Sequence, residues 1–173
     1  MPLSLYDITV PTFRQTLGAV KGLLDKSQAH CDAKGIPHSD FIEARLFEDM
    51  FPFSYQVKST VVHSVGALES LAKGVFSPDL APPPDSFAAL KQRVASGLIA
   101  LDALTPADVN AYEGKDMAFA FKDFKLPFTA ENFLMSFSLP NFYFHATTAY
   151  DIMRHKGVVI GKRDYMGEMR LKR

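Results

Sequence analysis

The chain has 173 residues, of which 47% are hydrophobic and 22% charged, a balance typical of one globular domain with a substantial core. Its 19 basic and 19 acidic residues give a formal net charge of zero, so no overall field attracts the chain to nucleic acid or to an anionic membrane. The single cysteine excludes an intrachain disulfide and a thiolate metal cluster. No stretch reaches the roughly 18 apolar residues of a membrane span. We therefore expect one cytoplasmic domain over residues 1–173.

Apolar residues recur at helical spacing from Leu3 to about His30, which predicts an amphipathic first helix. Pro11 lies on its outward side and predicts a kink or a restart. Gly35 and Pro37 should then end the helix. The segment from His38 to Leu46 favours a short connecting helix.

A second long helix is predicted after Pro52. Its apolar stripe consists of Val57, Val61, Val65, Leu68 and Ala72. A charged flank, expected to face solvent, consists of Lys58, Glu69 and Lys73. The remaining flank is uncharged and mostly small, and it consists of Gln56, Ser59, His63, Ala67 and Ser70. This flank indicates contact with another helix or the lining of a polar cavity, unless it is simply a mild solvent face.

The segments predicted after the second helix are a proline-rich connection, a third helix and a pair of strands. A rigid proline-rich connection follows from Val75 to Asp85, and Ser86 or the residue before it then begins a third helix that ends near Leu104. Between Met117 and Phe128, apolar and other residues alternate on both sides of a turn, which predicts a β-hairpin. We expect this hairpin to cover one end of the helical core.

The last helical region is predicted to start at Thr129, to be interrupted or kinked at Pro140 and to stop at Gly157. Plotted at the helical period, His145 lies on or beside the apolar side. His155 lies about 15 Å further along the helix, so the two cannot share a metal ion. The outward pair Tyr143 and Phe144 suggests a dimer or partner interface.

Three stretches carry a resemblance to a known family: MPLSLYDITVPTFRQTL, ARLFEDMFPFSYQV and FTAENFLMSFSLPNFYFHATTAYDIMRHKGVVIGKRDYMG. They resemble a bacterial family of unknown function within the DinB-like superfamily of helical bundles. The resemblance implies an all-α fold, an up-down-down-up four-helix bundle with a small β-hairpin before the last helix, often assembled as a homodimer. Members of the superfamily commonly hold a divalent metal with three histidines, one on the second helix and two on the fourth.

On these positions, His63 matches the second-helix ligand and His145 the first ligand of the fourth helix. The third histidine is absent, because Thr148 and Ala149 stand where it is expected. A metal site would need completion by water or by a further side chain, and would hold Zn²⁺ or Ni²⁺ weakly. The candidates for that further ligand are Gln56, Asn141 and Tyr6.

The sequence therefore favours a noncatalytic or small-ligand-binding bundle with a buried polar site at His63 and His145. The alternative is a divalent-metal-dependent enzyme, a thiol-dependent transferase or a hydrolase, with a variant metal site. No nucleophile elbow, phosphate-binding loop, dinucleotide fingerprint or paired-carboxylate motif is present in the sequence. The enzyme classes recognised by such motifs find no support.

Overall fold

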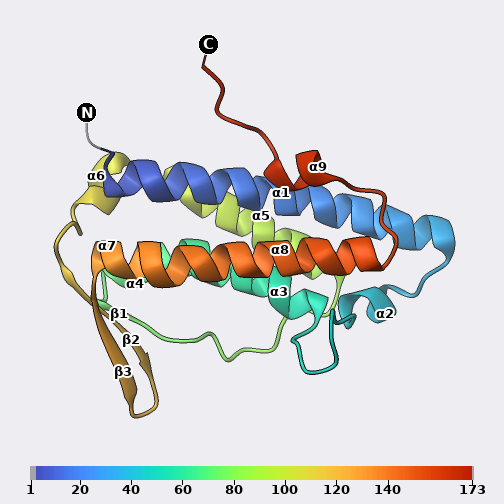
Figure 1. The fold of residues 1–173 in the computed structure, drawn as a ribbon, viewed down its shortest axis with the longest axis horizontal. Coiled ribbons are helices and arrows are strands. Elements are labelled where there is room, and N and C mark those ends of the chain that lie inside the picture. Colours follow the sequence, from blue (N-terminus) through green and yellow to red (C-terminus); the bar gives the residue numbers. More distant parts are fainter. Residues whose placement is uncertain (1–2, 173) are drawn as a thin grey trace.

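The computed structural model describes residues 3–172, in which long helices lie side by side and a small sheet projects at one end (Figure 1). The longer helices are α1 (Leu5–Lys34), α3 (Phe53–Val61), α5 (Phe87–Ala103) and α8 (Leu139–His155). The shorter ones are α2 (His38–Ile42), α4 (Ala67–Leu71), α6 (Pro106–Asn110), α7 (Ala130–Asn132) and α9 (Lys162–Met166). Two π-helical segments, η1 (Val62–Gly66) and η2 (Phe133–Ser138), lie within the helical runs. No helix within residues 3–172 has the length and apolar character that crossing a bilayer requires.

The first helix begins and ends as the sequence predicts. Ser4 and Asp7 form a reciprocal capping box at the start of α1, and Gly35 ends the helix in the left-handed conformation with φ of 65°. The helix runs through Pro11 unbroken, so no restart occurs there. Near its C-terminal end Cys31 is completely buried in the core, where burial raises the pKa of its thiol.

The second helix is confirmed as a continuous run of α3, η1 and α4. Its uncharged flank faces inward, because Gln56, Ser59, Ala67 and Ser70 are all buried, and α3 packs on α8. The flank is thus a helix contact rather than a solvent face.

The prediction that Lys58 faces solvent is wrong. Its side chain is 1% exposed, and its Nζ donates to the carbonyl oxygens of Asp79 (2.8 Å) and Ala81 and lies 3.3 Å from the Asp79 carboxylate. The connection from β1 to α5 contains these residues and runs along the bundle beside α4 and α3 (Figure 1), and its hydrogen bonds hold the lysine in a buried position. The helical pattern of α3 could not predict this burial, because it carries no information about the irregular connection between β1 and α5.

Close approach of α5 to its neighbours depends on Gly97. A Cβ placed on Gly97 would lie 3.2 Å from the side chains of both Leu17 and Val61, so a larger residue would push α5 away from α1 and α3. The start of α5 is as predicted, because the Ser86 hydroxyl accepts a hydrogen bond from the Ala89 N–H.

The sheet has three strands in the order β1 (Val75–Phe76), β2 (Asp116–Phe121) and β3 (Phe124–Thr129). The predicted hairpin is confirmed as the antiparallel pair β2 and β3. The sequence did not predict β1, which pairs in parallel with β2, because two residues are too few to show an alternating pattern. The expected all-α fold with a hairpin is therefore corrected to a mostly helical fold with a three-stranded sheet.

The last helical run also begins and ends as predicted. The Thr129 hydroxyl caps α7 by accepting from the Asn132 N–H, and Gly157, with φ of 85°, follows the end of α8. Pro140 does not end the run. It lies in the first turn of α8, directly after η2. Because proline has no N–H to donate to the carbonyl four residues earlier, an irregular turn at this place is expected.

Replacing Lys58 with alanine should lower the free energy of unfolding by about 1–3 kcal/mol, because the carbonyl oxygens of Asp79 and Ala81 would lose a charged donor in a poorly hydrated position. Urea denaturation followed by circular dichroism measures this loss. Lys21→Ala, on the exposed side of α1, is the matched control and should change stability by less than about 0.5 kcal/mol. Equal effects of the two substitutions would contradict this account.

Candidate functional site

His63 and His145 lie next to each other across the contact between the second and last helical runs. Their ring centroids are 5.5 Å apart and their planes differ by 18°. His63 belongs to η1 and His145 to α8, and both side chains are half-buried. The structure therefore brings together the two histidines that the sequence singles out, from positions 82 residues apart.

Gln56 fixes the tautomer of His145. The Gln56 amide nitrogen donates to the carbonyl oxygen of Phe51 (2.9 Å), which directs the amide oxygen toward His145 Nδ1 at 2.7 Å. Since a carbonyl oxygen can only accept, His145 Nδ1 must carry the proton. The other ring nitrogen, Nε2, is then a hydrogen-bond acceptor.

His63 lies in a more apolar place. Its ring centroid is 5.4 Å from that of Phe76 and 5.8 Å from that of Phe137. Its Nδ1 atom is buried and has no hydrogen-bond partner in the described part of the chain. The backbone of the same residue is held firmly, because the carbonyl oxygen accepts a 2.7 Å hydrogen bond from the Ser138 hydroxyl.

Both imidazoles are neutral at neutral pH. Burial lowers the pKa of His63 from 6.5 to about 3, with a smaller contribution from the neighbouring His145. Burial also lowers the pKa of His145 from 6.5 to about 4. The apolar surroundings disfavour the charged form of each ring. The pair therefore offers uncharged ring nitrogens rather than positive charge.

Within the described residues, Asn141 and Tyr6 form their hydrogen bonds elsewhere. The Asn141 amide nitrogen donates to the Phe137 carbonyl oxygen within its own helical run (2.7 Å). The Tyr6 N–H donates to the Asn110 side chain (2.9 Å), which ties the start of α1 to α6. Within residues 3–172, neither side chain forms a hydrogen bond with the histidines.

Several aromatic residues surround the pair, and of these Phe144 was predicted from the sequence, as part of an outward interface with Tyr143. The rings of Tyr55 and Phe144 lie 6.0 Å and 5.4 Å from His145, and Phe51 stacks on Tyr55 at 4.0 Å. Phe51 and Phe144 are more than half exposed, at 58% and 55%, so the aromatic rings extend from the surface to the buried histidine. The four-residue spacing of Phe51 and Tyr55 is the sequence signal for these two members of the group.

Residues 5–166 match the family described as Domain of unknown function (DUF1993). The chain belongs to this family. Among solved structures, the DUF1993 chain is similar to a crystal structure of a DinB family member protein from Shewanella denitrificans, with 30% sequence identity and a TM-score of 0.84. That similarity covers 98% of this chain and 95% of the other. The resemblance to a family of unknown function within the DinB-like superfamily is confirmed. No curated protein matches the chain.

The side chains of this DUF1993 chain do not fit a three-histidine metal centre. The Thr148 hydroxyl donates to the Phe144 carbonyl oxygen (2.8 Å) within α8, and Ala149 is a core residue, 1% exposed. No cluster of three or more His, Cys, Asp or Glu residues suited to a metal ion occurs within the described residues. The groups at the site that could bind a metal are two imidazoles and the Gln56 amide. Both ends of that amide already form hydrogen bonds, to Phe51 and to His145.

The two histidines should make stability depend on pH. Their pKa values are lower in the folded chain than the 6.5 of free histidine, so the unfolded chain binds more protons. The free energy of unfolding should therefore be highest above about pH 6.5. It should fall as the pH drops toward 4, by about 1 kcal/mol per pH unit for each histidine. Urea titrations at pH 7 and pH 5 should show a smaller loss in His63→Gln and His145→Gln than in the wild type. A loss that is unchanged in both variants would contradict the shifted pKa values.

Proposed function

We propose that this chain is a noncatalytic, small-ligand-binding bundle protein whose ligand lies against His63 and His145. The observation that carries the proposal is the buried Nδ1 atom of His63, which has no partner within the described residues. A buried polar atom without a hydrogen bond costs about 1–3 kcal/mol. A ligand that supplied the missing hydrogen bond would recover this cost.

The surroundings of the pair define the chemistry of such a ligand. The imidazoles are neutral, so neither a carboxylate nor a phosphate gains a charge partner there. Aromatic rings flank the pair on the side of Tyr55 and Phe144 and on the side of Phe76 and Phe137, and offset or edge-on contacts between rings are favourable. We take His63 Nδ1 to be an acceptor, with the proton on Nε2, so the best match is an uncharged planar molecule that carries one O–H or N–H donor.

We also infer the up-down-down-up order of the four-helix bundle. After α4, the connection between β1 and α5 runs back along the bundle before α5 begins (Figure 1). Such a return lets two successive long helices run in the same direction, which short connections do not allow. The close structural similarity to a DinB family member supports the same order.

A homodimer and a cytoplasmic location remain part of the proposal. Tyr143 and Phe144 lie on the outer side of α8, and their side chains are 38% and 55% exposed. Exposed aromatic residues on one helix face are typical of protein interfaces, which supports the interface suggested from the sequence.

Phenol is a suitable probe of the histidine site, because it is planar, uncharged at neutral pH and carries one O–H donor. In NMR titrations at pH 7, phenol should shift the ring-proton signals of His63 and His145 with a Kd in the millimolar range, about −4 kcal/mol. Anisole, which lacks the donor, should bind at least about fivefold more weakly.

His63→Phe should reduce phenol binding to the level of anisole, whereas His155→Gln, on the exposed end of α8, should leave it unchanged. Equal binding of phenol and anisole, or shifts confined to other residues, would count against a donor-binding site at the pair.

One observation favours the metal-dependent alternative. Gln56 holds the Nδ1–H of His145, and ligating histidines are commonly oriented in this way by a hydrogen bond to their second nitrogen. Zn²⁺ or Ni²⁺ would bind there weakly with the two imidazoles as protein ligands.

The metal content of protein purified without an affinity tag separates the two proposals. We expect far less than one zinc or nickel ion per chain by mass spectrometry, and no saturable uptake in Zn²⁺ titration calorimetry. One ion per chain that is lost in His63→Ala and His145→Ala, but kept in His155→Ala, would establish the metal-dependent alternative instead.

A further inference from the structure

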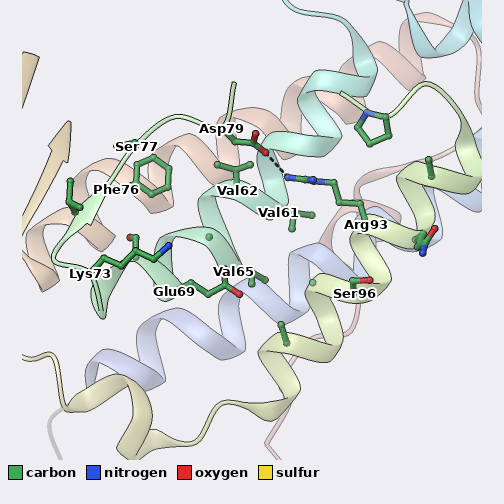
Figure 2. A pocket seen from close by; sticks show the side chains of 18 residues that line it. Val61, Val62, Val65, Glu69, Lys73, Phe76, Ser77, Asp79, Arg93 and Ser96 are labelled. Atoms are coloured by element: carbon green, nitrogen blue, oxygen red, sulfur yellow. Dashed lines mark hydrogen bonds and ion pairs between the residues drawn. The ribbon is translucent and has the colours of Figure 1, made fainter. Parts of the chain in front are cut away.

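A second site lies on the other side of the second helical run from the histidines. It is a cavity of about 850 Å³ between the run from α3 to α4, the helix α5 and the connection that follows β1 (Figure 2). Phe76 contacts both sites, since it lines this cavity and also packs on His63 at the histidine site. The volume falls in the range of about 300–1,000 Å³ that is usual for small-ligand sites.

The middle of the cavity is apolar and roomy. In Figure 2, Val61, Val62 and Val65 lie between the charged side chains of Arg93 and Lys73. Gly66 also lines this part, and a Cβ placed on it would come no closer to any neighbour than 4.0 Å, from the Val61 carbonyl oxygen. The space beside the valines is therefore large enough to hold an apolar chain.

The charged residues that line the cavity are Glu69, Lys73, Asp79 and Arg93, whose charges sum to zero. At the Arg93 end, the buried Lys58 behind Asp79 adds one further positive charge. The single carboxylate of Asp79 serves two cations, since one oxygen lies 2.9 Å from Arg93 Nη2 and the other lies 3.3 Å from Lys58 Nζ. Figure 2 shows Arg93 reaching across to Asp79. This group of Lys58, Arg93 and Asp79 thus carries a net positive charge of one.

Arg93 also has unused hydrogen-bonding capacity. Its Nε atom is buried and has no acceptor within the described residues, although a guanidinium group offers five N–H donors in one plane. A carboxylate matches this planar group through two parallel hydrogen bonds. A second carboxylate here would balance the excess positive charge and supply an acceptor.

We propose that this cavity binds a small organic carboxylate with an apolar chain. The carboxylate pairs with Arg93 and the chain lies on the valines of the second helical run. The apolar middle selects against inorganic anions, which have nothing to place there, and the excess positive charge selects against the uncharged amide of the same acid.

Hexanoate is the probe. In ¹H–¹⁵N NMR titrations of the wild-type chain at pH 7, hexanoate should shift backbone signals of the residues that line the cavity, with saturation. Hexanamide, which has the same chain without the charge, should bind at least about tenfold more weakly, because charge-assisted hydrogen bonds contribute about 1.5–3 kcal/mol. Inorganic phosphate should produce no saturable shifts at these residues.

Two variants test the two halves of the site. Arg93→Gln should weaken hexanoate binding at least about tenfold, and Gly66→Leu should abolish it by filling the space beside the valines. Lys21→Gln removes a charge from the exposed side of α1 and should leave binding unchanged. His63→Phe should also leave it unchanged, which separates this cavity from the histidine site.

Hexanoate that produces no saturable shifts, or that binds no better than hexanamide, would overturn the proposal. Unchanged binding in a folded Arg93→Gln variant would do the same. If Arg93→Gln does not fold, the comparison of hexanoate with hexanamide and the Gly66→Leu variant still decide the outcome.

Discussion

The hydrogen bond from the Ser138 hydroxyl to the His63 carbonyl oxygen (2.7 Å) is the interaction on which the arrangement of the histidine site depends. It joins η1 and η2, the two π-helical segments, at the point where the second and last helical runs meet. A π-helical turn departs from the regular hydrogen-bond pattern of the helix, and such turns are frequent at functional sites. Because Ser138 is fully buried, no water competes for this bond, and the two runs are held in one register.

Part of the site could be anticipated from the sequence. The helical pattern placed His145 on or beside an apolar side, whereas the uncharged flank with Gln56 and His63 left a helix contact, a polar cavity and a mild solvent face open. The pairing of His63 with His145 is what the resemblance to the DinB-like superfamily implies. The sequence also marked a disturbance at Pro140. It did not show that the disturbance takes the form of a π-helical segment before the proline, or that a matching segment occurs at His63, because neither has a distinct residue pattern.

Other features depended on contacts that a single segment does not encode. Lysine is usually a surface residue. Lys58 is buried because the proline-rich connection packs against α3 and accepts its hydrogen bonds. Tyr6 lies on the first helix, α1, and its backbone N–H is tied to the Asn110 side chain at the end of the bundle. The strand β1 exists because β2 lies beside it. In each case the deciding partner is distant in sequence.

The complete burial of Cys31 has a practical consequence. Thiol reagents attack the thiolate, and both the closed core and the raised pKa of this thiol keep the folded chain unreactive. Because the sequence contains one cysteine, modification of the unaltered chain reports on a single place near the end of α1. The rate at which a thiol reagent labels the native protein then measures how often that part of the bundle opens, so the chain carries its own probe of local unfolding.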